Sequence, residues 1–276
     1  MSTVAGNLQG IGLGTPSEFA GRGKTPLWKA LAFAGAVLGG MSFLDHLQEL
    51  RRRIIKSVIA VAVGIGICTI YAASVVRFLK APAAEYGIEL VGYGAMEIFS
   101  LYFHVALAGG ICLAAPVILF QVWRFIEPAL YNHEKRYALP FVISTTVFFV
   151  LGAVFGFAIA APYIMKMQQE MAVLMEIQWR PSAMEYISLL TATVVAMGVV
   201  FEMPPVIFIL SRIGLVDARF LLRNFKYACL ILSVASAVLT PSGDVGPMMA
   251  FLAVMLGLYF FSILVALVFG RKRRVE

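Results

Sequence analysis

The feature that most constrains this chain is a series of six long apolar segments, at residues 54–73, 99–123, 139–162, 187–213, 225–240 and 247–269. A helix needs about 20 apolar residues to cross the hydrocarbon core of a membrane. With 61% hydrophobic and 13% charged residues in 276, the chain is too apolar for a soluble fold. The sequence therefore predicts an all-α integral membrane protein with six transmembrane helices. The fifth segment, of about 16 residues, is expected to be a short crossing.

Positive charges predict the orientation of these helices. Of the 22 Lys and Arg residues, 18 fall in the N-terminal region, in the loops after the second and fourth segments and in the C-terminal tail. Since Lys and Arg are retained on the cytoplasmic side, both termini are expected in the cytoplasm. This asymmetry accounts for the net charge of +7 without a nucleic-acid partner. The RKRR run at 271–274 is interpreted as a topological stop that contacts lipid.

Residues 1–40 differ from the rest of the chain and are expected to be a poorly ordered or dispensable extension. Their weakly apolar run at 27–40 is too short to span a membrane, and the arginines that follow it argue against a cleaved signal peptide. Because Met41 directly precedes the first helical pattern, a start at Met1 and a start at Met41 both stay open. Residues 41–276 are expected to form a single transmembrane domain.

The segment SFLDHLQELRRR, residues 42–53, leads into the first apolar run. Ser42 and Asp45 fit a capping box, so a helix should begin near Ser42. One interpretation is an interfacial helix whose arginines touch lipid headgroups. That interpretation leaves the carboxylate of Glu49 unexplained. A second acid, Glu134, lies among bases in the inner loop 121–140, and two such acids could hold a pair of guanidinium groups through bidentate hydrogen bonds.

Glu202 is an ionisable residue inside an otherwise apolar segment, GVVFEMPPVIF. Carboxylates within the membrane are costly and usually functional. Pro204 and Pro205 remove backbone donors and should kink or break the helix, so Glu202 is expected to face a wet cavity. A protonated carboxyl hydrogen bonded within the bundle is the alternative. His104 is interpreted as a helix-contact residue, and Gly64, Gly66, Gly152 and Gly156 as close-packing positions.

Four segments, in order, resemble the TatC family, the large polytopic subunit of the twin-arginine protein translocase. They are FLDHLQELRRRI at 43–54, APVILFQVWRFIEPALYNHEKR at 115–136, FEMPPVIFIL at 201–210 and LTPSGD at 239–244. The resemblance covers most of residues 41–276. It implies a concave bundle with short spans five and six in the bacterial inner membrane. It also implies a multi-copy complex with single-span TatA- and TatB-type partners that exports folded proteins using the protonmotive force.

The resemblance also assigns roles to individual residues. Glu49 and Glu134 match the family's signal-recognition acids, and Glu202 matches an acid of its intramembrane pocket. The remaining matches are Arg51 and Phe125 beside the recognition acids, and Pro82, Pro116 and Asp244 at positions expected to be architectural. Span six departs from the family, since it has only apolar residues from 250 to 261 where the family often has a proline and a glutamate.

Two other classes of function are alternatives to a translocase subunit. A proton- or cation-coupled small-molecule transporter could use Glu202 as its coupling carboxylate, but it predicts an inverted repeat, and none is visible between the two halves. An intramembrane hydrolase needs a nucleophile with a base or a metal pair. The spans contain no such motif, and no metal site or cofactor is expected. The sequence therefore favours a transport component without covalent catalysis.

Overall fold

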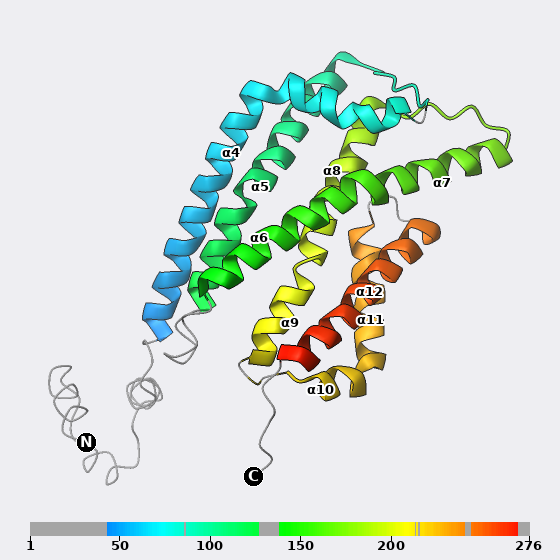
Figure 1. Cartoon of the computed structure of the whole chain (residues 1–276). Helices are drawn as coiled ribbons and strands as arrows, with labels where there is room; N and C mark the ends of the chain where they lie inside the picture. Colours follow the sequence, from blue (N-terminus) through cyan, green and yellow to red (C-terminus); the bar gives the residue numbers. More distant parts are fainter. Residues whose placement is uncertain are drawn as a thin grey trace, which may run out of the picture. The chain divides into compact units, whose positions relative to one another are not determined.

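All the regular elements of the described residues are helices (Figure 1). The computed structural model describes residues 43–85, 87–126, 138–212, 214, 216–240 and 244–269. It divides into two compact units, residues 1–55 and 56–276. The elements are α4 (Phe43–Glu85), α5 (Ala95–Ile126), α6 (Ala138–Phe155), the π-helical turn η3 (Gly156–Ala160), α7 (Ala161–Leu174), α8 (Ala183–Val200), α9 (Met203–Arg212), α10 (Ala218–Arg223), α11 (Phe225–Leu239) and α12 (Val245–Phe269).

Within the described residues, five helical segments are long and apolar enough to cross a membrane. They are 47–84, 96–125, 141–174, 183–212 and 245–269. The predicted all-α architecture is confirmed, and α11 is a shorter apolar helix of 15 residues, as its sequence indicates. The expectation of a short sixth span is wrong, because α12 has 25 residues. Its apolar sequence is continuous, and Pro247 lies in the first turn, where the missing N–H costs no intrahelical bond.

The long connections after the first and third predicted spans both contain helix. Helix α4 continues to Glu85, and α6, η3 and α7 follow one another without a gap. The segment 141–174 has 34 residues. At the helical rise it extends about 51 Å, which exceeds the hydrocarbon thickness of about 30 Å. Part of this segment therefore lies beyond the hydrocarbon or is strongly tilted.

The turn η3 is a π-bulge that joins α6 to α7. The backbone N–H of Ala161 donates to the carbonyl of Gly156, five residues earlier. An inserted residue of this kind rotates the helix that follows relative to the helix that precedes it. Ala161, Ile164 and Met165 of α7 are consequently buried in the main hydrophobic cluster, against residues of α8.

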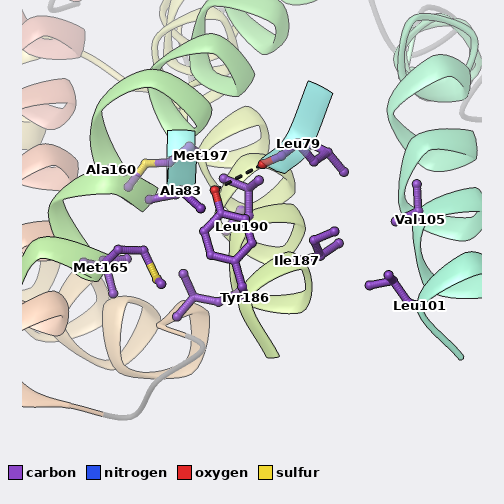
Figure 2. Packing of buried hydrophobic residues seen from close by; sticks show 14 of the residues in the cluster. Leu79, Ala83, Leu101, Val105, Ala160, Met165, Tyr186, Ile187, Leu190 and Met197 are labelled. Carbon is purple, nitrogen blue, oxygen red and sulfur yellow. Dashed lines mark hydrogen bonds between the residues drawn. The ribbon is translucent and has the colours of Figure 1, made fainter. Parts of the chain in front are cut away.

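The main cluster joins the C-terminal end of α4 to α5, α7 and α8 (Figure 2). Its centre is formed by Ile187, Leu190 and Met197 of α8 and Val105 of α5, each at most 1% exposed. The hydroxyl of Tyr186 donates to the carbonyl of Leu79 at 3.1 Å, as Figure 2 shows. A buried hydroxyl without such a partner would be destabilising, so this bond fixes the side chain in the cluster.

Small residues and one polar contact hold the helices together. A Cβ added to Gly152 of α6 would overlap the Met197 carbonyl oxygen of α8, and one added to Gly64 of α4 would meet the backbone of Gly110 in α5. Close packing at these glycines is therefore confirmed. The prediction for Gly66 is wrong, since nothing lies within 4 Å of its added Cβ. His104 is a helix-contact residue as predicted, since its Nε2 lies 2.8 Å from Oγ1 of Thr191 in α8.

Gly152→Ala should lower the free energy of unfolding by about 1–3 kcal/mol, the range for overpacked cores. The added methyl group meets backbone, which has no rotamer to escape into. Unfolding of the purified protein by SDS titration measures the change. Gly66→Ala is the matched control and should raise stability slightly, because alanine has the higher helix propensity. An equal response of the two variants would contradict the packing assignment.

Candidate functional site

The helix that contains residues 183–212 is interrupted at Phe201 and Glu202, between α8 and α9. Pro204 and Pro205 have no N–H, so the carbonyls four residues before them lose their usual helical donors. The N–H of Glu202 instead bonds the carbonyl of Val199 at 3.1 Å, in a tighter turn. The helical pattern resumes when Val206 N–H donates to the Glu202 carbonyl at 3.1 Å. The predicted break is confirmed.

The break places Glu202 between two hydrophobic clusters. Phe201 packs with the cluster around α8, and its ring lies 5.4 Å from that of Phe155 in α6. Met203 packs with the second cluster, formed by α9 to α12 together with Val200 at the end of α8. Both carboxyl oxygens of Glu202 are buried and have no hydrogen-bond partner within the described part of the chain. A buried carboxyl in this state has capacity for a polar partner, so the break is a candidate binding position.

Glu49 lies in the first unit, in the N-terminal part of α4. Its Oε1 accepts a hydrogen bond from Nη2 of Arg53 at 2.6 Å, and the two side chains are only 17% and 18% exposed. Its Oε2 is buried and has no partner among the described residues. The resemblance singled out Arg51, whose side chain is exposed. The spacing of four residues was visible in the sequence and could have identified Arg53 as the partner.

The segment 121–140, which contains Glu134, is only partly within the described residues. Glu134 lies outside them, and Phe125 lies near the end of α5, half-buried. Helix α5 ends at Ile126, two residues before Pro128. Just before this end, Trp123 is 1% exposed, and its ring centroid is 4.3 Å from that of Phe141 in α6. Sequence reasoning passed over Trp123, which fixes the helix end from which the loop leaves.

In the sequence, Arg212 serves only as one of the positive charges that predict the orientation of the helices. In the structure it lies at the end of α9. Its guanidinium carbon lies 5.6 Å from the ring centroid of Phe208 and 5.9 Å from that of Phe269. These distances fall within the range of cation–π attraction. Arg212 thus links the last turn of α9 to the last turn of α12.

A set of hydrogen bonds, called here the Glu97 clamp, joins the segment that leads into α5 to the segment that leads into α8. The Oε2 of Glu97 accepts from Tyr93 N–H at 2.8 Å, and its Oε1 accepts from Met184 N–H in the first turn of α8 at 3.3 Å. The loops also pair directly, since Ala183 N–H donates to the Val91 carbonyl at 2.9 Å and Tyr93 OH donates to the Arg180 carbonyl at 3.0 Å. Glu97 lies in the first turn of α5, where an acid is a capping signal that the sequence could have supplied.

The remaining residues singled out from the sequence lie on separate helices. Pro82 is inside α4 near its C-terminal end, and Pro116 is inside α5. Asp244 is exposed and directly precedes α12, where its carbonyl accepts from Met248 N–H at 3.1 Å. These three positions lie on, or directly before, different helices, and their expected architectural role stays a prediction.

Comparison with known proteins supports the family resemblance. The profile of the family described as "Sec-independent protein translocase protein (TatC)" matches residues 45–266. A protein of that name from Koribacter versatilis is 36% identical over 247 residues, which are 86% of this chain and 89% of the relative. A relative of the same name from Aquifex aeolicus is 35% identical over 85% of this chain and 98% of its own. The solved structure titled "Crystal Structure of Twin Arginine Translocase Receptor- TatC" aligns with a TM-score of 0.74 at 36% identity, over 82% of this chain and 100% of that one.

Replacing Glu97 with alanine should speed amide hydrogen exchange at Tyr93 and Met184, because both N–H groups lose their acceptor. Hydrogen-exchange mass spectrometry of the purified protein measures both peptides. Glu89→Ala is the matched control in the same loop. Its carboxylate is largely exposed and lies 3.9 Å from Arg180, so exchange should stay unchanged. Unchanged exchange at both amides in the Glu97 variant would remove the clamp assignment.

Proposed function

The chain belongs to the TatC family of Sec-independent protein translocases, and on that premise we propose that it recognises twin-arginine signal peptides at the cytoplasmic membrane face. It is a translocase subunit and not an enzyme. The observation that carries the proposal is the state of Glu49, a largely buried carboxylate with one oxygen bonded to Arg53 and the other without a partner in the described residues. Such a group can accept a further guanidinium.

Recognition of two arginines needs two carboxylates, and we assign the second role to Glu134. A planar guanidinium can donate two parallel hydrogen bonds to each carboxylate, which an ammonium group cannot. We also assign Arg51 and Phe125 to signal-peptide binding. Arg51 follows Glu49 by two residues on α4, and Phe125 lies near the end of α5, just before the sequence segment that contains Glu134.

Glu202 has a separate part in the proposal. The apolar portion of the signal peptide, or a polar group of a single-span partner, would reach the break between α8 and α9. There it would meet a buried carboxyl that lacks a hydrogen-bond partner within the described residues. Satisfying such a group in a low-dielectric environment strengthens binding, because the alternative is an unpaired polar group.

The proposed setting is the bacterial inner membrane, with six crossings and both termini in the cytoplasm. The fifth crossing in this scheme is α11, whose 15 residues require local thinning of the bilayer or tilting of its neighbours. TatA- and TatB-type subunits are the proposed partners in a multi-copy complex driven by the protonmotive force. Pro82, Pro116 and Asp244 would shape the helices of this assembly.

Glu49→Ala and Glu134→Ala should each reduce crosslinking to a twin-arginine precursor to background, because each removes one guanidinium acceptor. Site-specific photocrosslinking in membrane vesicles measures this. Glu170→Ala is the control, since its carboxylate is exposed on α7. A precursor with both arginines replaced by lysine should fail to crosslink to the unaltered chain. Undiminished crosslinking in both acid variants would refute the recognition role.

Glu202→Ala should impair export or assembly, and Glu202→Gln should have a milder effect where hydrogen bonding matters more than charge. Export of a folded reporter and co-purification with the single-span subunits are the two measurements. Glu185→Ala is the matched control, because Glu185 is an exposed acid in the first turn of α8. Normal export and assembly in the alanine variant would reduce Glu202 to a packing residue.

A further inference from the structure

The short helix α10 leads directly into α11, as Figure 1 shows. Together, α10 and the start of α11 carry basic and aromatic side chains that the receptor role does not use. Three exposed cations fall within eight residues, at Arg219, Arg223 and Lys226. Two exposed aromatic residues, Phe220 (53%) and Tyr227 (56%), lie among them. We propose that this basic–aromatic surface binds the headgroup of an anionic phospholipid of the cytoplasmic leaflet. The inference rests on the proposed cytoplasmic placement of α10 and not on signal recognition.

The surface is held in place by contacts on its inner side. Asp217 caps α10, since its Oδ1 accepts from Phe220 N–H at 2.6 Å. Asn224 Nδ2 donates to the Phe220 carbonyl at 2.9 Å, and the hydroxyl of Tyr259 in α12 donates to the Leu221 carbonyl at 2.9 Å. Leu221 is buried with the α12 cluster. The cations therefore project from a fixed backbone, which lowers the entropy lost on binding.

The charges on this surface lack an internal counterion. Arg219 and Arg223 are four residues apart on one face of α10, a spacing at which like charges repel. Within the described residues, no carboxylate lies within salt-bridge distance of either arginine or of Lys226. Lys226 instead lies 4.9 Å from the ring centroid of Tyr227. A phosphate between the cations would replace repulsion with charge-assisted hydrogen bonds.

The apolar surroundings favour a lipid over a soluble anion. Leu222 is 54% exposed beside the cations, and Leu230 and Ile231 continue the exposed apolar surface along α11. Cations and aromatic rings that adjoin a continuous apolar surface are typical of the membrane interface, where the headgroup meets the charges and the acyl chain meets the apolar side chains. An inorganic phosphate would use only the first of these contacts.

The test is lipid retention by the full-length protein in detergent, measured by native mass spectrometry during titration with phosphatidylglycerol or phosphatidylcholine. The unaltered chain should retain phosphatidylglycerol preferentially, and inorganic phosphate should not displace it. Arg219→Gln, Arg223→Gln and Lys226→Gln should each weaken binding about fivefold, which corresponds to about 1 kcal/mol for each interfacial cation. Because the protein is in detergent, this result is independent of signal recognition and of membrane orientation.

A matched control triple variant removes the same charge elsewhere, through Arg77→Gln, Lys166→Gln and Arg180→Gln. These residues lie outside α10 and α11, so the preference for phosphatidylglycerol should persist. A triple variant that combines Arg219→Gln, Arg223→Gln and Lys226→Gln should lose the preference for phosphatidylglycerol. The proposal would be overturned if this triple variant retained as much phosphatidylglycerol as the unaltered chain, or if the unaltered chain retained phosphatidylcholine as well as phosphatidylglycerol. It would also be overturned if the control variant lost as much phosphatidylglycerol as the α10–α11 triple variant. The SDS unfolding midpoint of each variant distinguishes lost binding from lost folding.

Discussion

The backbone of a membrane-spanning chain must satisfy its own hydrogen bonds, because hydrocarbon offers no donors or acceptors. This requirement governs the break between α8 and α9. Pro204 and Pro205 withdraw two donors, and the chain responds with a tighter turn at Glu202 before the helical pattern resumes at Val206. The carbonyls freed by these two prolines therefore lie at the same interruption of the helix as the carboxyl of Glu202. A side chain that costs free energy in lipid lies where the backbone already needs polar partners.

The break also separates two packing environments. Helix α8 belongs to the cluster shared with α4, α5 and α7, whereas α9 packs mainly with α12. Helix α8 is fixed along its length by three kinds of contact: the Glu97 clamp at its first turn, the His104 hydrogen bond to Thr191, and the close approach of Gly152 to Met197. Phe201 packs with the α8 cluster, whereas Met203 packs with the α9–α12 cluster, which Val200 of α8 also joins. Glu202 therefore lies at the junction of the two clusters.

The sequence predicted the elements well because apolar length and proline position act locally. The six apolar runs and the interruption before Pro204 depend on residues close together in the chain. What it could not predict depends on partners far away. Gly66 and Gly152 look alike as helical glycines, yet only Gly152 faces another backbone. The bond from Glu97 to Met184 N–H joins residues 87 positions apart, so no local pattern reveals it.

The ion pair between Glu49 and Arg53 is the observation on which the proposed recognition role rests. Without a partner, a largely buried carboxylate would be costly, and Arg53 lowers that cost through Oε1. The remaining oxygen is left as an acceptor, so an incoming guanidinium can bind without first displacing Arg53. A lysine ammonium could approach the same oxygen, but it lacks the planar pair of donors that fits a carboxylate edge. In the proposed recognition site, pre-pairing with Arg53 would therefore orient the Glu49 carboxylate and leave the discrimination between arginine and lysine to the geometry of the second bond.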